Sequence, residues 1–185
     1  MTLFTLVFLI YFCIVVVVRI QVFRIRGEEG GTVHDNWTFP AIFLSYLVAV
    51  MGSLVEFFIR IPQVNLMISL SGYLLATAGV MLTRRSVMAL GRWWSVRIEI
   101  KNHHQVVEDG PYRSSRHPYY LAAILELGGL CLILNSFRAL LYMLCVHIPL
   151  LIARISSEEK VLASSLGTRY RDYQKRVGVL PFASG

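Results

Sequence analysis

The chain begins with the apolar run MTLFTLVFLIYFCIVVVV (residues 1–18), which contains no charged side chain. Three later runs are similar and cover residues 36–55, 61–83 and 119–153. The last of them contains only two charges, Glu126 and Arg138. A helix that crosses a bilayer core about 30 Å thick needs roughly 20 apolar residues. Together with 56% hydrophobic residues, 16% charged residues and a mean hydropathy of +0.59, these runs exclude a soluble fold.

We predict an all-α integral membrane protein with about five transmembrane helices. The predicted spans lie near residues 2–18, 40–59, 64–83, 119–134 and 139–153. The last two are shorter than a full crossing and form a hairpin that turns at residues 135–138. No basic residue precedes the first span, and Arg19 follows it in place of a small-residue cleavage site. We therefore expect a retained helix and not a signal peptide.

Basic residues are concentrated on one predicted side of the membrane. With five spans, loops 19–39 and 84–118 and the tail after residue 153 share a side, and they hold 3, 7 and 6 of the 18 basic residues. Only Arg60 and Arg138 fall on the other side. The positive-inside rule then gives an outside or lumenal N-terminus and a cytosolic C-terminus. The formal charge of +7 reflects this topology and attraction to lipid headgroups, so nucleic-acid binding is not expected.

The chain divides into two predicted regions. Residues 1–83 hold three N-terminal transmembrane helices. Residues 84–185 form the predicted catalytic region, with loop 84–118, the helical hairpin 119–153 and a cytosolic C-terminal helix. No glycine-rich nucleotide loop and no His-Glu-x-x-His motif occurs in the sequence. The three cysteines lie far apart within predicted spans, so we interpret them as packing residues and expect no metal site.

Ionisable side chains within or beside the predicted spans need a partner or a cavity. Glu56 lies four residues before Arg60, which predicts an ion pair on one helix face. Glu126 lies about two turns into the fourth span and either lines a cytosolic pocket or hydrogen-bonds to a neighbouring helix. Arg154 and Glu158 are also four residues apart, and their simplest interpretation is an ordinary ion pair at the membrane surface.

Two polar motifs in the second region follow each other in order. The first joins Gly110-Pro111-Tyr112-Arg113 to Arg116-His117-Pro118-x-Tyr120, and the second is Arg154-x-x-x-Glu158-Glu159, trailed by Leu162, Gly167, Tyr170, Tyr173 and Leu180-Pro181. With the apolar hairpin between them, these motifs resemble the isoprenylcysteine carboxyl methyltransferase family of integral membrane enzymes. The first motif also resembles phospholipid N-methyltransferases and some membrane sterol reductases. The resemblance covers about residues 91–182, while the first ninety residues fit by hydropathy only.

The resemblance implies S-adenosylmethionine as methyl donor and S-adenosylhomocysteine as product, in a cytosolic pocket built from the 84–118 loop and the C-terminal segment. Carried over by position, the cofactor contacts are His104, Gln105, Val106, Val107, Tyr112, His117, Pro118, Tyr119, Tyr120 and Glu158. Arg154 corresponds to the residue that contacts the substrate. A glutamine that binds cofactor in eukaryotic members has no clear counterpart, and Arg97 and Ile98 lie nearest to its place.

The chemistry of the cofactor agrees with these positions. We expect Glu158 and Glu159 to face its cationic groups and Arg116 or Arg113 to pair with its carboxylate, because charge-assisted hydrogen bonds are the strong ones. Tyrosine or histidine rings can stack on the adenine.

The expected reaction is an in-line displacement by an oxygen of a lipophilic acceptor. A carboxylate needs only to be oriented, which we assign to Arg154. A phenol or enolic pyrone needs a base, for which Glu126 and His117 are candidates. We thus predict Arg154, Glu158 and Glu126 as catalytic residues.

The predicted function is methyl esterification of a prenylcysteine-type carboxylate by a membrane O-methyltransferase. Alternatives are O-methylation of a long-chain alkylpyrone or alkylresorcinol, as in bacterial members that Glu126 and the Arg154 motif also resemble, and phospholipid N-methylation. A sterol-reductase-like oxidoreductase needs a nicotinamide cofactor and more spans, and a non-catalytic anchor leaves the motifs unexplained. Expected partners are a lipophilic or prenylated substrate and membrane lipid. The expected location is the plasma membrane in a bacterium or the endoplasmic reticulum in a eukaryote.

Overall fold

The structure, a computed structural model, describes residues 3–24, 31–34, 37–59, 64–101 and 104–181. Its main helices are α1 (Leu3–Phe23), α2 (Thr38–Ile59), α3 (Leu66–Leu90), α4 (Pro118–Ile133), α5 (Phe137–Tyr142), α6 (Ile148–Leu166) and α7 (Thr168–Arg176). One turn of π-helix, η3 (Met143–His147), joins α5 to α6 without a break. The shorter elements are the 3₁₀ turns η1 (Gly91–Trp93) and η2 (Gly110–Arg113) and the strands β1 (Thr32–Val33) and β2 (Glu99–Ile100).

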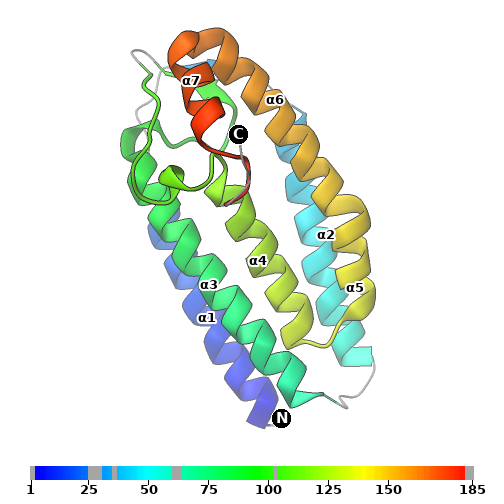
Figure 1. Ribbon diagram of the computed structural model, residues 1–185. Helices are drawn as coiled ribbons and strands as arrows, with labels where there is room; N and C mark the ends of the chain where they lie inside the picture. Colours follow the sequence, from blue (N-terminus) through cyan, green and yellow to red (C-terminus); the bar gives the residue numbers. More distant parts are fainter. Residues whose placement is uncertain (1–2, 25–30, 35–36, 60–63, 102–103, 182–185) are drawn as a thin grey trace.

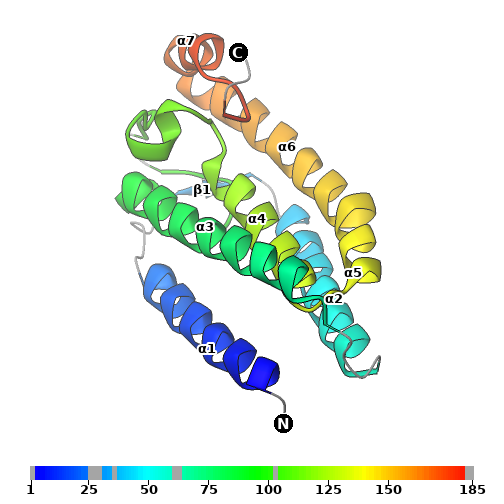
Figure 2. The same cartoon turned by 60° about the horizontal axis from the view of Figure 1, so that its bottom comes forward.

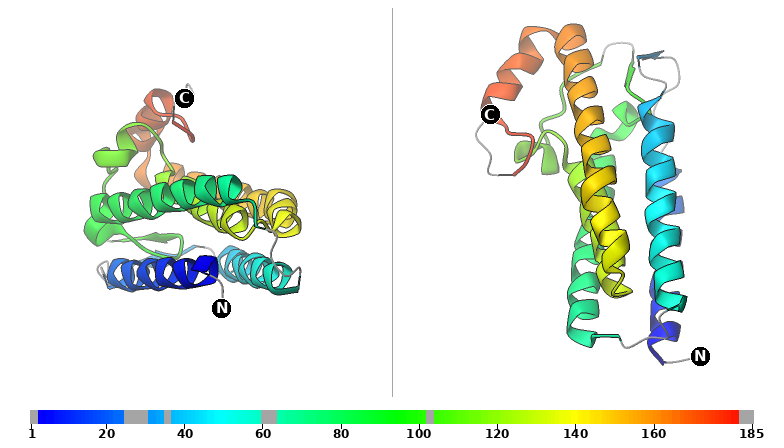
Figure 3. Two further views of the ribbon diagram at one scale, coloured as in Figure 1. Left: turned by 90° about the horizontal axis from the view of Figure 1, so that it is seen from below. Right: turned by 90° about the vertical axis from the view of Figure 1, so that its right-hand side faces the viewer.

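The long helices form two layers. α1 and α2 occupy one layer, and α3, α4 and the continuous helix α5–η3–α6 form the other (Figure 3). Within the described residues, four segments are long and apolar enough to cross a membrane, namely Leu3–Val22, Thr38–Ile59, Leu66–Trp93 and Phe137–Leu166. The prediction of an all-α integral membrane fold is confirmed. The prediction of about five spans corresponds to these four and to α4, which at 16 residues is shorter than a full crossing.

α3 and α4 approach each other more closely than any other helices of the described chain. A Cβ atom added at Gly72 would lie 2.5 Å from the backbone nitrogen of Ile133, and one at Gly129 would lie 2.5 Å from that of Ala76. Small residues permit this close approach. In a lipid bilayer, the van der Waals contacts that result are a main driving force for helix association. The pair forms a tightly packed wall at the centre of the bundle.

The predicted turn between the fourth and fifth apolar segments is present at the end of the bundle that holds the N-terminus (Figure 1). Asn135 adopts a positive φ of 53° there, and its Oδ1 accepts a hydrogen bond from the backbone N–H of Asn65 at 3.0 Å. Glu56 Oε2 accepts the backbone N–H of Arg138 at 3.1 Å and so caps the start of α5. The predicted pairing of Glu56 with Arg60 lies outside the described residues.

The opposite end of the bundle gathers the polar segments. β1 and β2 pair as an antiparallel ribbon with Val33 opposite Glu99, so the α1–α2 connection reaches the 84–118 loop. At Gly167, with φ of 62°, the chain turns from α6 into α7, which folds over the same loop (Figure 2). Grouping of the loop and the C-terminal tail at one end agrees with the prediction. The ribbon was not expected, because two-residue strands are too short to show an alternating pattern.

Candidate active site

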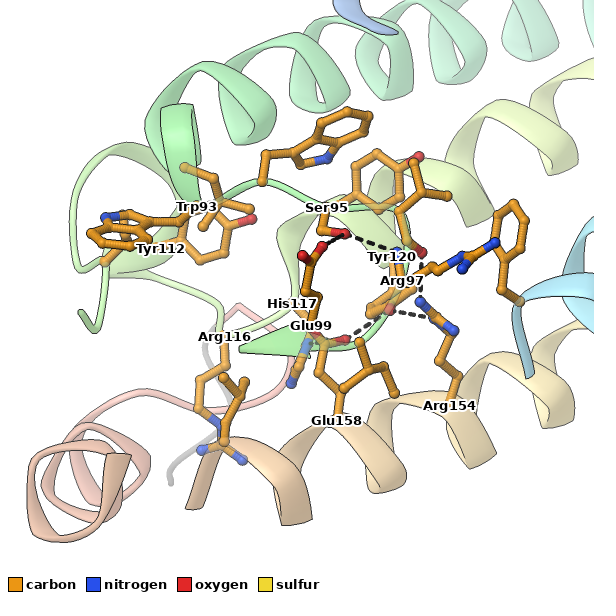
Figure 4. Close-up of a pocket in the computed structure, with 18 of the residues that line it drawn as sticks. Trp93, Ser95, Arg97, Glu99, Tyr112, Arg116, His117, Tyr120, Arg154 and Glu158 are labelled. Atoms are coloured by element: carbon orange, nitrogen blue, oxygen red, sulfur yellow. Dashed lines mark hydrogen bonds and ion pairs between the residues drawn. The ribbon is translucent and has the colours of Figure 1, made fainter. Parts of the chain in front are cut away.

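A cavity of about 620 Å³ lies where the ribbon, the 84–118 loop, α4, α6 and α7 meet, and Figure 4 shows its polar side chains. Its volume is in the range of small-molecule sites. Arg154 and Glu158 on α6 and His117 at the start of α4 line its outer part. Further into the bundle, the walls come from α2 and from the inner turns of α6 and are largely apolar. The cavity is therefore amphipathic along its length.

Most of the residues predicted to bind the cofactor line this cavity. They are His104, Gln105, Val106, Val107, Tyr112, Arg116, His117, Tyr119, Tyr120 and Glu158. Arg154 also lines it, as do Arg97 and Ile98, which flank the place of the missing glutamine. Pro118, Glu126 and Glu159 are not part of the lining. Pro118 is buried as the first residue of α4, and the two carboxylates have structural partners described below.

Arg154 and Glu158 are joined through a third side chain and not directly. The Tyr120 hydroxyl donates to Glu158 Oε2 at 2.7 Å and accepts a hydrogen bond from Arg154 Nε at 2.8 Å. The direct ion pair predicted from the four-residue spacing is therefore wrong, because both side chains contact Tyr120 instead. The two side chains do lie on the same helix face. Figure 4 shows the resulting line of three groups along the cavity wall.

Arg154 is held by hydrogen bonds to three neutral groups of the described chain. Its Nη1 donates to Thr38 Oγ1 at 2.7 Å and its Nη2 to the carbonyl of Val96 at 2.7 Å, so α2, α4 and the loop all fix it. The residue is 4% exposed. Among the described residues, no carboxylate forms an ion pair with it. A buried guanidinium with neutral partners attracts an anionic group into the cavity.

Glu159 holds the polar end of the protein together from outside the cavity. It accepts hydrogen bonds from Arg116 Nε at 3.1 Å, Tyr170 Oη at 2.7 Å and Gln174 Nε2 at 2.6 Å, and it contacts His117 Nε2 at 2.6 Å. These partners belong to the loop, α4 and α7. Glu159 thus fixes the first motif and the C-terminal helix relative to each other. These contacts differ from the contact with the cofactor that was predicted for Glu159.

The C-terminal segment is strapped to the loop by further bonds. Tyr173 Oη donates to the carbonyl of Tyr112 at 2.6 Å, and Ser115 Oγ donates to that of Val179 at 2.7 Å. An apolar stripe of the tail packs against Val106 of the loop; it includes Leu162, Leu166, Tyr173 and Val177. Burial raises the pKa of Tyr112 and of Tyr173, so both phenols stay neutral at physiological pH.

The loop side of the cavity carries an aromatic platform. The ring of His104 stacks on Trp93, with centroids 5.1 Å apart, and Arg92 covers Trp93 at 4.3 Å. Buried Lys101 donates from Nζ to the carbonyls of Arg92 at 2.8 Å and Trp94 at 3.0 Å, which fixes this turn. Burial and the charge of Lys101 lower the pKa of His104 from 6.5. A neutral imidazole beside an indole suits the binding of a planar base.

Glu126 belongs to the wall behind the cavity. Its Oε2 accepts Nε of Arg19 at 3.1 Å and also Nη2 of that residue, and its Oε1 accepts Thr83 Oγ1 at 2.5 Å. Of the two interpretations of Glu126, hydrogen bonding to neighbouring helices is the one that the structure shows. Arg19 itself lines the cavity and Glu126 does not, so the cationic member of this pair faces the cavity. This geometry removes Glu126 as a candidate base.

Several lining residues were not identified from the sequence. Glu99 on β2 lines the cavity and accepts Ser95 Oγ at 2.8 Å and the backbone N–H of Gly31 at 3.0 Å. Other missed residues lie within apolar spans; among them are Phe39, Ile42, Phe43, Tyr46, His147 and Leu151. An apolar helix in a membrane shows no contrast between its lipid-facing and inward sides, so its pattern could not have found them.

Comparison with known proteins now decides the family. The sequence model of the "Isoprenylcysteine carboxyl methyltransferase (ICMT) family" matches residues 67–164, more than half of the chain. The chain belongs to the isoprenylcysteine carboxyl methyltransferase family. The resemblance predicted from the two motifs is confirmed, and the matched segment contains loop 84–118, α4, Arg154 and Glu158.

Relatives in this family carry a methyltransferase name. Protein-S-isoprenylcysteine O-methyltransferase B of Arabidopsis thaliana is 27% identical over 158 residues, which cover 83% of this chain and 79% of that protein. Protein-S-isoprenylcysteine O-methyltransferase of Mus musculus is 29% identical over 152 residues, which cover 77% and 53%. The chain is therefore a membrane methyltransferase, and it spans about half the length of the mouse relative.

The fold of the family is also the fold of this chain. A solved structure of the eukaryotic intramembrane Ras methyltransferase ICMT, determined without a monobody, matches with a TM-score of 0.65 and 27% identity over 75% of this chain. The match covers 53% of that protein. An intramembrane enzyme with this architecture agrees with the four apolar spans and confirms the integral membrane character.

Proposed function

We propose that the chain transfers a methyl group from S-adenosylmethionine to the carboxylate of a prenylcysteine-type lipid. One observation carries this proposal: a carboxylate and a buried guanidinium face the same cavity one helical turn apart, joined by a phenol. Glu158 is the anion for a cationic donor, and Arg154 is the cation for an anionic acceptor. The names of the relatives agree with this assignment.

The donor end of the cavity has groups that fit S-adenosylmethionine. The side chain of Glu158 is 28% exposed and accepts a hydrogen bond from Tyr120, which leaves lone pairs for an ammonium or sulfonium. Trp93 and neutral His104 offer a surface for the adenine. Arg116 lines the cavity and can pair with a carboxylate, although Glu159 already occupies its Nε. When bound, the donor supplies an electrophilic methyl carbon on a sulfonium.

The chain's own residues orient the acceptor and exclude water. Arg154 is fixed by Thr38, Val96 and Tyr120, and its remaining N–H donors can hold an acceptor carboxylate without paying for a new conformation. A carboxylate is already a nucleophile at neutral pH, so no base is needed. α7 covers the polar end of the cavity, and the inner walls are apolar. Both features keep the local dielectric constant low, which strengthens the contacts between charged groups.

The inner walls suit a long apolar chain. Phe39, Ile42 and Phe43 of α2 face the cavity, and Leu151 of α6 lies opposite on the same lining. A lipid bound with its carboxylate at Arg154 would place its chain along these side chains. Burial of such a chain contributes about 25 cal/mol for each Å² removed from water.

The alternative acceptors differ in how well they suit Arg154. The amine of a phospholipid such as phosphatidylethanolamine is an ammonium at neutral pH, and its N-methylated product is also cationic, so a buried arginine beside it is unfavourable. The oxidoreductase alternative has no support from the family match, which is to a methyltransferase family. We further propose that α7 and the 84–118 loop face the cytosol, because 13 basic residues lie in loop 84–118 and the tail after residue 153, seven and six respectively.

An acceptor panel tests the proposal. Purified protein in lipid nanodiscs is incubated with methyl-labelled S-adenosylmethionine and either a farnesylcysteine, an alkylresorcinol, an alkylpyrone or phosphatidylethanolamine. We expect label in a farnesylcysteine ester that mild base releases as methanol, and no label with Arg154→Met. Label confined to a base-stable ether or to an N-methyl group would overturn the carboxylate assignment.

A further inference from the structure

The antiparallel ribbon contributes a carboxylate to the cavity wall. Glu99 on β2 lines the cavity, and no function was assigned to it from the sequence. In the part of the chain that the structure describes, no cationic side chain forms an ion pair with it. A carboxylate removed from bulk water needs a full set of hydrogen-bond donors. The donors that the protein supplies therefore show what is left for a ligand.

Two neutral donors fix this carboxylate. Ser95 Oγ donates to Oε2 of Glu99 at 2.8 Å and itself accepts the backbone N–H of Arg97 at 3.2 Å. The backbone N–H of Gly31 donates to Oε1 at 3.0 Å. A side chain at Gly31 would prevent this contact, because a Cβ atom there would lie 2.5 Å from Cγ of Glu99. The carboxylate is thus held by the 84–118 loop and by the connection between α1 and α2.

Each oxygen of the carboxylate keeps capacity for a further hydrogen bond. An ionised carboxylate offers about four acceptor positions, two on each oxygen. Glu99 receives one hydrogen bond at each oxygen from the described chain. The remaining positions are therefore shared evenly between the two oxygens. Two neighbouring hydroxyl groups match this pattern, since each can donate one charge-assisted hydrogen bond to one oxygen.

The carboxylate is tied to the aromatic platform. Its partner Ser95 follows Trp93, the last residue of η1, by two positions. Burial lowers the pKa of His104, which stacks on Trp93, and the charges of Glu158 and Glu99 oppose that shift. Both carboxylates therefore lie near the His104 ring, so Glu99 belongs to the same end of the cavity as the proposed donor site.

The order of groups along the wall matches the order of groups in S-adenosylmethionine. In the view of Figure 4, Trp93 lies on one side of Glu99, and Tyr120 lies on the other side, where it donates to Glu158. The donor carries adenine at one end and its sulfonium towards the other, and a ribose joins the two. With the adenine on the platform and the sulfonium at Glu158, the ribose and its two neighbouring hydroxyls fall at Glu99.

We propose that Glu99 binds the ribose of the methyl donor and accepts one hydrogen bond from each of its two hydroxyl groups. The inference deepens the proposed function and rests on it, in that S-adenosylmethionine occupies this cavity. Ser95 and the backbone of Gly31 position the carboxylate. Carboxylates hold a ribose hydroxyl at parallel sheets that bind dinucleotides, whereas the described part of this chain uses a short antiparallel ribbon.

A matched pair of nucleosides tests the contact without methyl transfer. 5′-Methylthioadenosine keeps the adenine and ribose of the donor but lacks its sulfonium, ammonium and carboxylate. The 2′,3′-dideoxy form of this nucleoside lacks the two hydroxyls as well. Both compete with labelled S-adenosylhomocysteine for the protein in lipid nanodiscs. We expect the wild-type protein to bind 5′-methylthioadenosine about 10- to 100-fold more tightly than the dideoxy form, because one hydrogen bond to a charged group contributes about tenfold or more.

Variants assign this preference to the carboxylate. Glu99→Ala should bind the two nucleosides with similar affinity, and Ser95→Ala should reduce the preference about threefold because Oε2 loses the donor that positions it. Glu108→Ala is the matched control, since it removes an exposed carboxylate that pairs with Arg176, and it should keep the full preference. Glu158→Gln should weaken the binding of S-adenosylmethionine and also keep the preference between the nucleosides.

The outcomes separate this contact from the rest of the proposed function. Equal affinity of the two nucleosides for the wild-type protein overturns the ribose contact, and this comparison needs no variant to fold. A preference that persists in Glu99→Ala overturns it as well. So does a loss of S-adenosylhomocysteine binding in Glu99→Ala with unchanged binding of 5′-methylthioadenosine, which would place the ammonium at this carboxylate. A wild-type protein that binds neither compound contradicts the donor site and the ribose contact together. Failure of the proposed acceptor would appear separately, as absent carboxyl methylation with the nucleoside preference intact.

Discussion

The hydroxyl of Tyr120 accepts a hydrogen bond from Nε of Arg154 over 2.8 Å. The same hydroxyl donates to Glu158, so one phenol couples the proposed acceptor end of the cavity to the proposed donor end. Hydrogen bonds to charged groups contribute about 1.5–3 kcal/mol each. Tyr120 is thus placed to transmit the position of one bound molecule to the other.

Replacing this phenol should impair both ends at once. Tyr120→Phe is expected to lower kcat/KM by roughly 10- to 100-fold, because both charged side chains lose a partner. Steady-state kinetics with each substrate varied in turn measures the effect. Tyr73→Phe is the matched control, since the Tyr73 hydroxyl is buried without a hydrogen-bond partner among the described residues. Wild-type kinetics in Tyr120→Phe would show that the bridge has no functional role.

The two charged residues should fail in different ways. Glu158→Gln and Arg154→Met are both expected to abolish most methyl transfer while the protein stays folded. Calorimetric titration should show weaker cofactor binding in Glu158→Gln and near-normal binding in Arg154→Met. The loss in Glu158→Gln should be larger for S-adenosylmethionine than for S-adenosylhomocysteine, which lacks the sulfonium. Normal affinity for both in Glu158→Gln contradicts the proposed donor site.

The buried pair between Arg19 and Glu126 should matter mainly for stability. Glu126→Leu leaves a cation buried without its partner and is expected to cost about 3–5 kcal/mol. Arg19→Met/Glu126→Leu removes both charges and should recover most of that loss. Thermal unfolding in detergent, followed by circular dichroism, compares the three proteins. An unchanged melting temperature in Glu126→Leu would be inconsistent with the pairing.

Two adjacent glycines on α4 should tolerate substitution differently. A Cβ at Gly129 would meet the backbone nitrogen of Ala76 at 2.5 Å, whereas one at Gly128 would lie 3.5 Å from the end of the Met143 side chain. Gly129→Ala is therefore expected to destabilise the protein by about 1–3 kcal/mol, and Gly128→Ala by much less. The melting temperatures of the two variants give the comparison. Equal effects would mean that α3 and α4 are not in backbone contact.

His104 should make stability depend on pH. Its pKa is lowered in the folded protein by burial and by Lys101, so the folded state disfavours the proton that the unfolded chain accepts below about pH 6.5. The stability linked to this group is complete above that pH and is lost as the pH falls below it. His104→Phe keeps an aromatic ring against Trp93 and should show a smaller loss of melting temperature between pH 7.5 and 5.5. An identical loss in both proteins argues against this linkage.

Sequence patterns predicted the features that depend on local spacing. Charge-free runs located the helices, and the four-residue spacing of Arg154 and Glu158 correctly placed both on one face. The same spacing suggested a direct ion pair, because nothing local reveals that Tyr120 from another helix inserts between them. Contacts of this kind depend on tertiary packing, which no periodicity encodes.

A second reason explains why sequence patterns did not reveal the inward-facing residues of the membrane spans. His147 is buried within the π-turn η3, in an apolar stretch of the helix, and the partner of Glu126 lies on α1, over a hundred positions away. In a membrane both the interior and the surroundings are apolar, so hydrophobicity does not distinguish an inward residue from an outward one. Only the three-dimensional structure reveals that His147 faces inward and that Glu126 pairs with Arg19.

The division of the cavity wall between two parts of the chain has an evolutionary consequence. The family match, residues 67–164, contains the 84–118 loop, Arg154 and Glu158, whereas α1 and α2 supply Arg19, Phe39 and Tyr46 to the lining. Under the proposed function, substitutions in the first two helices alter which lipid is accepted and leave the handling of the methyl donor untouched. Changes in the membrane-spanning helices that precede residue 67 would in this way redirect the proposed methyl transfer to new lipids.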